Sequence, residues 1–169
     1  MLKIQEQLNN TITEIVKSRN NDSIEGMLDE YIVESLMEYL KNHKEFYVYD
    51  ETLVYADYPR NFLGLYKRST KQVIVNIFYA KDISRRIVNL GYTRLIEHFV
   101  LTMLHEHRHA WQWFNNDETT KTPLVDSKKD YKGYWEHPME VDARNTSEKY
   151  MAEAMEYLVN KLRSSYLNK

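Results

Sequence analysis

Apolar residues recur along the chain with two spacings, and each spacing predicts a different kind of element. Where they fall three or four positions apart, they predict amphipathic helices over residues 2–18 and 23–43. The same spacing predicts a long helix over residues 92–115 and a last helix over residues 138–167, with Pro138 in its first turn. Helices therefore account for most of the predicted secondary structure.

The segment at residues 46–79 has a different pattern, in which short β-branched and aromatic runs alternate with polar breaks. Such runs are typical of strands that have one buried face. The pattern therefore predicts a small, mostly antiparallel sheet. Its strands are expected at residues 47–49, 53–55, 62–66 and 73–77.

Three connecting segments complete the expected architecture. Residues 67–71 are expected to form a hairpin turn, residues 82–89 a short helix, and residues 115–133 a long polar loop. No linker or internal repeat is visible, so the whole chain, residues 1–169, is expected to form a single α+β domain. Residues 1–44 would supply its N-terminal helices.

The composition narrows the chemistry that this domain can support. The chain has no cysteine, which excludes disulfides and thiolate metal sites, so a bound metal would need nitrogen and oxygen ligands. The net charge of −2 gives no sign of a nucleic-acid partner. No apolar run approaches the ~20 residues that span a bilayer, and residues 1–7 lack a signal-peptide core. We therefore expect a soluble, cytoplasmic protein with no membrane partner.

The helix predicted over residues 92–115 contains the motif His-Glu-x-x-His, at His105, Glu106 and His109. Residues four apart on a helix lie about 40° apart around its axis and about 6 Å along it, so both imidazoles can bind one metal ion. Glu106 lies beside the pair and can take a proton from a water molecule without being a ligand itself. The motif therefore predicts a catalytic metal site with Glu106 as the general base.

A catalytic zinc usually has a third protein ligand, which we expect downstream on another element. Suitable donor atoms there belong to Glu136, His137, Glu140 and Asp142. Donor chemistry alone does not choose among these four side chains. A group that stabilises the transition state is usually a Tyr, His or Arg near the metal, and the candidates are Tyr131, Tyr134 and His137.

The motif at residues 105–110 is followed about thirty residues later by the sequence Pro138-x-Glu140-x-Asp142-Ala143. Together these stretches resemble the small zincin metallopeptidases whose third ligand is a glutamate. The likeness is greatest to the ImmA/IrrE-type and other phage-associated bacterial proteins, and it covers roughly residues 62–150. It implies a zincin-like fold in which the C-terminal helix carries the third ligand.

The resemblance implies a role for each matching position. His105, His109 and Glu140 would bind one Zn²⁺ per chain, and Glu106 would be the general base. Ala143 would be the small residue that lets the last helix approach the motif helix. The activity implied is that of a zinc-dependent metalloendopeptidase acting on a protein or peptide substrate, such as a regulatory protein.

One position departs from the family pattern. Related zincins often have an aspartate four residues after the ligand glutamate, where it orients a ligand histidine, but this chain has Arg144 there. Asp142 is no simple substitute, because on a helix it would point about 200° away from Glu140. Tyr134, His137 and Asp142 remain candidates for contacts to the ligands or the transition state.

In zincins an edge strand pairs with extended substrate, and residues 73–77 hold the matching place in the chain order.

Two further histidines lie near the motif. His107 falls within the apolar arc of the predicted helix, so we expect a packed, hydrogen-bonded side chain rather than a ligand. His98 lies two turns before His105, roughly 10 Å away along the helix, which is too far for the same ion. We expect His98 at the surface or behind the ligands.

Two other functions fit parts of the pattern. A non-hydrolytic zincin, acting as a binding or regulatory protein, would use the metal structurally, and a fourth protein ligand such as His137 or Asp142 would favour it. A di-iron carboxylate bundle would use Glu106-x-x-His109, but that architecture needs two such motifs. No other histidine here has a glutamate three residues before it, which disfavours the bundle.

Overall fold

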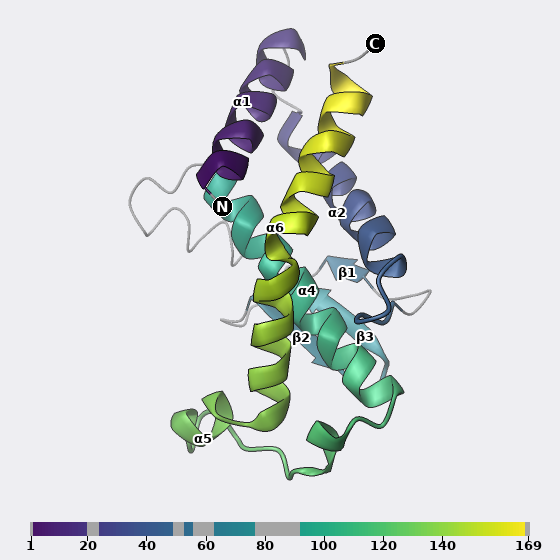
Figure 1. Ribbon diagram of the computed structural model, residues 1–169, viewed down its shortest axis with the longest axis vertical. Helices are drawn as coiled ribbons and strands as arrows, with labels where there is room; N and C mark the ends of the chain where they lie inside the picture. The colour runs from purple at the N-terminus through teal and green to yellow at the C-terminus, as the bar shows by residue number, and fades with distance from the viewer. Residues whose placement is uncertain (1, 20–23, 49–52, 56–62, 77–91, 168–169) are drawn as a thin grey trace.

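The structure is a computed structural model, and it describes residues 2–19, 24–48, 53–55, 63–76 and 92–167. Within these residues the chain has an α+β fold that is mostly helical, as the apolar spacing predicts (Figure 1). The four long helices begin and end within two residues of the predicted positions. The helices are α1 (Leu2–Arg19), α2 (Ile24–Lys41), α4 (Tyr92–Phe114), α5 (Tyr131–Trp135) and α6 (Pro138–Tyr166), with a 3-10 helix η1 (Glu118–Lys121).

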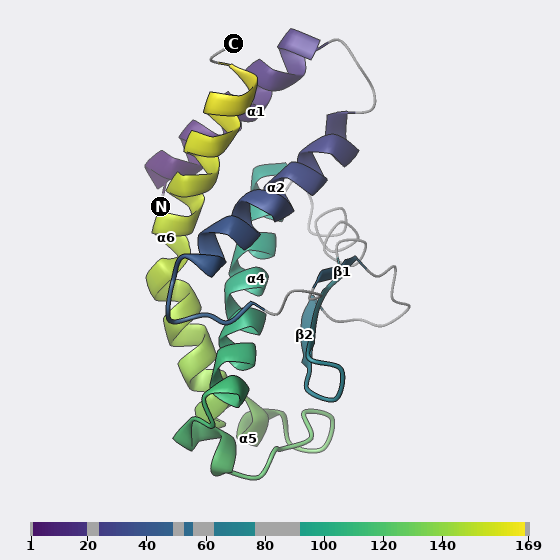
Figure 2. The same ribbon diagram turned by 90° about the vertical axis from the view of Figure 1, so that its right-hand side faces the viewer.

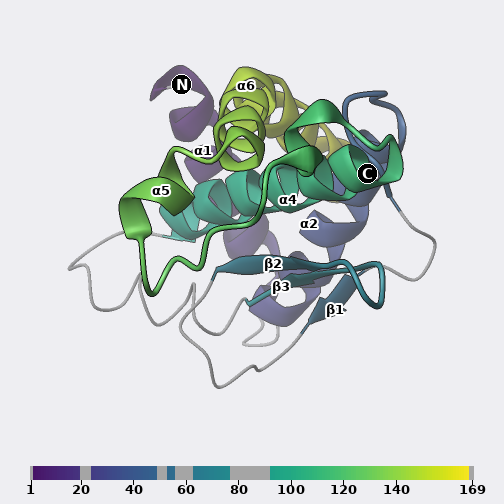
Figure 3. The ribbon, with the colours of Figure 1, turned by 90° about the horizontal axis from the view of Figure 1, so that it is seen from below.

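Helix α4 lies in the middle of the fold, between α6 on one side and the sheet on the other (Figures 2 and 3). Its apolar face packs toward both neighbours, which explains why apolar residues cover a wide arc of this helix. The N-terminal helices α1 and α2 each contact both α4 and α6. None of the described helices combines the length and apolar character needed to cross a bilayer.

The core is one continuous cluster of buried side chains. It joins the N-terminal helices, the motif helix and the last helix, and it includes two valines of the sheet, Val73 and Val75. Helix α6 contributes a periodic row of apolar residues to it, which is the pattern that predicted this helix. Fully buried members include Leu8, Ile15, Val100, Met103, Met155, Leu158 and Leu162.

The sheet has three described strands, β1 (Leu53–Tyr55), β2 (Gly64–Lys67) and β3 (Gln72–Val75), in the order β1-β3-β2. β2 pairs with β3 in antiparallel fashion, whereas β1 pairs with β3 in parallel. The described sheet is therefore mixed: the antiparallel β2–β3 pair agrees with the prediction, and the parallel β1–β3 pair was not predicted. The turn between β2 and β3 occupies the place predicted for the hairpin, with Lys71 at a φ of 53°.

The position of β3 also corrects the predicted edge strand. Residues 73–77 were the candidate for pairing with substrate, but β3 lies between two other strands. Strand β2 lies at the end of the described sheet and contacts α4. The order of strands along the chain does not fix their order in the sheet. Here β1 pairs in parallel with β3, so β3, the last strand in the chain, is the central strand of the three.

Two other segments differ from the predictions. Tyr47 and Val48 do not form a strand; instead the Tyr47 ring stacks on Phe114 at a centroid distance of 3.7 Å. The predicted loop at 115–133 contains η1 and the start of α5, which are capped by Asp117 and Asp130. In both caps an aspartate side chain accepts a hydrogen bond from a backbone N–H group. These two aspartates are local signals for a helix start, but the polar composition of the whole segment favoured a loop. The helix predicted at 82–89 lies outside the described residues.

Replacing Leu158 by alanine tests the shared core of α1, α2 and α6. The side chain is 0% exposed, so its removal should lower the free energy of unfolding by about 2–5 kcal/mol through lost burial and an unfilled cavity. Urea denaturation followed by circular dichroism would measure this. Glu156→Ala, at an exposed position of the same helix, should change stability by about 0.5 kcal/mol or less. Equal effects of the two changes would contradict the described core.

Candidate metal centre

Helix α4 places the two motif histidines on one side, one turn apart. Their Nε2 atoms, of His105 and His109, are 3.1 Å from each other. His109 is buried and His105 is partly exposed. Side chains four residues apart are neighbours on a helix surface, so this arrangement follows from helical geometry. The helix thus directs two nitrogen donors toward one point.

Helix α6 brings a carboxylate to the same point. Glu140 Oε2 lies 3.2 Å from His105 Nε2, and its Oε1 lies 3.3 Å from His109 Nε2. Within the described residues, these are the three side chains that could hold a metal ion, with ligand atoms all within 4.8 Å of one another. Of the four downstream candidates, the structure therefore brings Glu140 to the histidines.

The three donors suit a divalent transition-metal ion such as zinc. A tetrahedral ion with bonds of ~2.0–2.1 Å holds neighbouring ligand atoms about 3.3 Å apart. The two imidazole nitrogens are 3.1 Å apart, and each has a different Glu140 oxygen near it, at 3.2 Å from His105 and 3.3 Å from His109. Burial tends to raise the pKa of Glu140, but hydrogen bonds to His105 and His109 outweigh it and hold that pKa well below its usual range. Glu140 is therefore ionised at neutral pH, as a metal ligand must be.

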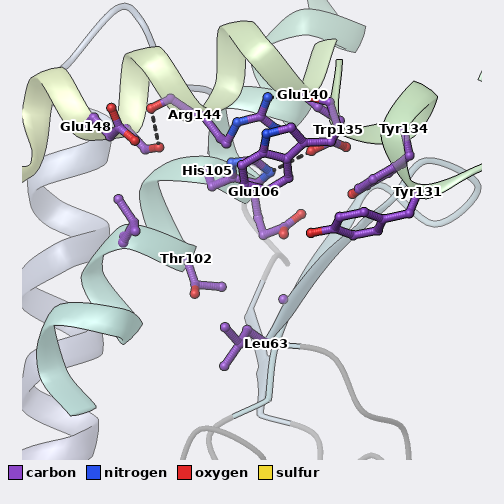
Figure 4. A pocket seen from close by; sticks show the side chains of 13 residues that line it. Leu63, Thr102, His105, Glu106, Tyr131, Tyr134, Trp135, Glu140, Arg144 and Glu148 are labelled. Atoms are coloured by element: carbon purple, nitrogen blue, oxygen red, sulfur yellow. Dashed lines mark hydrogen bonds and ion pairs between the residues drawn. The ribbon is translucent and has the colours of Figure 1, made fainter. Parts of the chain in front are cut away.

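Glu106 lies beside this group and lines the same cavity (Figure 4). It is 7% exposed, and this burial raises its pKa against the opposing charges of the two histidines. Strand β2 comes close to it: a Cβ atom at Gly64 would overlap the side chains of Glu106 and Thr102. The backbone of Tyr66, in the same strand, is near enough to Glu106 to lower its pKa slightly, against the larger effect of burial. The absence of a side chain at Gly64 thus allows the strand to lie against the carboxylate.

A chain of hydrogen bonds holds His109 from the side opposite Glu140. His109 Nδ1 donates to Gln112 Oε1 at 2.8 Å. Gln112 Nε2 in turn donates to the carbonyl oxygen of Met139 at 3.0 Å and to Asp142 Oδ2 at 2.7 Å. Gln112 is fully buried, and its amide has partners at both ends. This chain fixes the ring of His109 and leaves Nε2 directed at the metal position.

Sequence reasoning missed the role of Gln112. The family pattern directs attention to the position of Arg144, four residues after Glu140, whereas here the orienting group comes from the motif helix itself. Its spacing of three residues from His109 is the signal that could have identified it. Asp142, a candidate for contact with the ligands, does not bond His109 directly but accepts a hydrogen bond from Gln112. It also forms an ion pair with Arg108, whose Nε lies 2.7 Å away.

His137, one of the candidates for contacts to the ligands or the transition state, has hydrogen-bond partners away from the three donors. This buried residue is the N-cap of α6, where its Nδ1 accepts a hydrogen bond from the N–H of Met139 at 3.3 Å. Its Nε2 lies 3.2 Å from the carbonyl oxygen of Pro123 and donates to it. Both ring nitrogens are engaged in holding the start of the helix. A polar residue just before a helix can either cap the helix or act in a nearby site, and the sequence alone does not distinguish these two roles.

A cavity of about 600 Å³ opens beside the three donors, with walls from β2, α4, α5 and α6. Figure 4 shows Tyr131 and Tyr134 of α5 with their hydroxyl groups directed toward the region of Glu106. Burial raises the pKa of Tyr134, as does the negative charge of Glu140, so its hydroxyl remains protonated at neutral pH. Arg144 closes one wall by stacking its guanidinium on the Trp135 ring at 3.7 Å.

The other two histidines of α4 lie where the helical pattern predicts. His107 is fully buried, and its Nδ1 donates to the carbonyl oxygen of Met103 at 2.8 Å. Burial lowers the pKa of His107 to about 4, which keeps the ring neutral at pH 7. His98 is exposed and is not part of the donor group. Neither residue contributes to the candidate centre.

Comparisons with protein-family models, with curated proteins and with solved structures found no match for this chain. The function is therefore inferred from the geometry of the site and from the resemblance of its motifs.

Replacing Gln112 by leucine tests whether the orienting chain supports metal binding. Loss of the hydrogen bond to His109 should lower zinc affinity about ten- to hundredfold. Competition against a chromogenic chelator would measure it. Gln7→Leu makes the same replacement at an exposed position of α1 and should leave the affinity unchanged. A folded Gln112→Leu protein with wild-type affinity would show that the hydrogen bond does not position His109 for metal.

Proposed function

We propose that the protein is a zinc-dependent metalloendopeptidase with a zincin-like fold. The observation that carries the proposal is the position of Glu106, a buried carboxylate that lies outside the three-donor group but lines the same cavity. A structural metal needs no such neighbour. Hydrolysis needs one, because a base must remove a proton from the attacking water.

The residues divide the reaction among them. His105, His109 and Glu140 would hold the zinc, which when bound polarises the scissile carbonyl and makes water more acidic. Glu106 takes a proton from the attacking water and later delivers it to the leaving amine, so that addition of water yields a carboxylate and an amine. Because burial raises the pKa of Glu106, the side chain holds this proton more readily between the two steps.

Tyr134 is the proposed donor to the negative charge that develops on the carbonyl oxygen. Its side chain lines the same cavity as His105 and Glu140, two of the three donors. Its raised pKa keeps the hydroxyl protonated, as a hydrogen-bond donor must be. Of the other candidates, His137 caps α6 and Tyr131 is 66% exposed.

The substrate is proposed to be an extended protein or peptide segment lying along the outer edge of β2. This strand lies at the end of the described sheet, and Gly64 lines the cavity beside Glu106. An extended chain there would form main-chain hydrogen bonds with the strand, which suits peptides of varied sequence. A cytoplasmic regulatory protein as substrate rests on the resemblance to ImmA/IrrE-type proteins alone.

The alternative, a binding protein with a structural metal, requires the metal to be closed by a fourth protein ligand. His137 and Asp142 were the nominated donors, and both are engaged elsewhere, with Pro123 and with Arg108. Among the described residues, three donors gather and no fourth joins them. This supports a centre with one position open to water and substrate.

Metal analysis combined with a peptidase assay tests the proposal. Wild type and Glu106→Gln should each contain about one zinc per chain, and His109→Ala and Glu140→Ala should lose it, because a two-donor site binds zinc weakly. Glu106→Gln should lower kcat by about 10²–10⁴-fold on a fluorogenic peptide library, since the base is removed while the metal stays. Glu156→Gln, at an exposed position of α6 outside both cavities of this region, should change neither property. A metal-free wild type after zinc reconstitution would refute the hydrolase.

The role of Tyr134 is tested by a matched pair of substitutions in α5. Tyr134→Phe should lower kcat by about 10²-fold or more with little change in KM, because its hydroxyl is needed in the transition state rather than for binding. Tyr131→Phe removes the same hydroxyl from an exposed ring and should have a small effect. Similar losses in both variants would assign the hydroxyls to substrate binding instead.

A further inference from the structure

A second cavity, of about 540 Å³, continues the first one along α4 toward the N-terminal end of that helix. Leu101 and Glu148 line both cavities, so the two are adjacent parts of one surface depression. The walls of the second cavity come from α1, α4 and α6, through residues such as Gln5, Glu97 and Ala152. The proposed reaction makes no use of these side chains.

Glu97 provides this cavity with an acceptor that is not satisfied. The residue is 7% exposed, and its Oε1 atom has no hydrogen-bond partner in the part of the chain that the structure describes. Its other oxygen, Oε2, accepts a hydrogen bond from Arg94 Nη1 at 3.0 Å, which fixes the orientation of the carboxylate. Leaving a buried carboxylate oxygen without a donor is costly, so this oxygen would be stabilised by an N–H donor that reached it.

The lining of the cavity indicates which donor fits. The ionisable side chains of the lining are two carboxylates, Glu97 and Glu148, one arginine, Arg94, and one histidine, His98. The Arg94 guanidinium already pairs with Glu97. This surplus of negative charge favours a cationic N–H donor. Leu101 and Met151 add apolar surface, against which the methylene stem of a long side chain can pack. A lysine or arginine side chain combines the charge and the stem.

We propose that the second cavity is a specificity subsite that binds a lysine or arginine side chain of the substrate polypeptide. This rests on the proposed peptidase function, since the first cavity would hold the scissile bond. Glu97 and His105 lie eight residues apart on one helix, or about 12 Å along its axis. An extended chain advances about 3.3 Å per residue, so the basic residue lies about three to four positions from the scissile bond.

A binding experiment tests the subsite without requiring hydrolysis. The probes are the N-acetyl, N′-methylamide derivatives of lysine, arginine and norleucine, titrated into the ¹⁵N-labelled full chain. Lysine and arginine should give saturable amide shifts at residues 94–101 and 148–152, and uncharged norleucine should give none. Equal binding of norleucine would overturn the proposal, because it would show that charge is not recognised.

Variants locate the binding on Glu97. Glu97→Gln preserves the shape of the side chain and removes its charge, so it should weaken binding of the lysine probe about tenfold or more. Glu156→Gln, the same change at an exposed position of α6 outside the cavity, should leave binding unchanged. Undiminished binding to Glu97→Gln would overturn the proposal. If that variant does not fold, Ala152→Phe fills the cavity from the surface, and retained lysine shifts would then refute the site.

A cleavage profile links the subsite to the proposed reaction. On a peptide library prepared by cutting proteins after glutamate, wild-type cleavage sites should be enriched in Lys or Arg at one position, about three to four residues from the cut bond. Glu97→Gln should lose this enrichment, and Glu156→Gln should keep it. Cleavage without a basic preference would refute the subsite and leave the peptidase intact. Probe binding without any cleavage would refute the peptidase and leave the cation site intact.

Discussion

The contact between α4 and α6 is the constraint on which the candidate centre depends. Helix α4 supplies His105 and His109, but two imidazoles bind a catalytic zinc only with a further ligand, and Glu140 comes from α6. Ala143 lies three residues after Glu140 on α6 and is fully buried, as expected for a small residue where two helices approach closely. Gln112 bridges the two helices, so the hydrogen bond that orients a ligand also joins the surfaces that bring the ligands together.

Sequence reasoning predicted the features that depend on local geometry. The helix boundaries follow from apolar spacing, and the pairing of His105 with His109 follows from the pitch of a helix. The burial of His107 follows from its position within the apolar arc of the same helix. Glu140 was different, because donor chemistry left four choices and only the resemblance to zincins favoured it. The structure places it 3.2 Å from His105, which geometry along one helix could not have shown.

The features that were missed depend on how distant segments meet. The inner position of β3 depends on where β1 pairs, and the role of Gln112 depends on where Met139 and Asp142 lie across the helix contact. His137 was ambiguous because a histidine before a helix can cap it or face a site, and the neighbouring loop decides the outcome. Such choices are made by tertiary packing, which a single sequence does not display.

Helix α6 is one continuous element of 29 residues, about 43 Å long. Its first turn carries Glu140, and its later turns pack against α1 and α2 through residues such as Leu158. A metal that binds the native state alone stabilises every element whose unfolding would release it. Because one continuous helix joins the candidate centre to the distant core, a metal bound by Glu140 would be coupled to the packing of the N-terminal helices, and its loss would be felt far from the site.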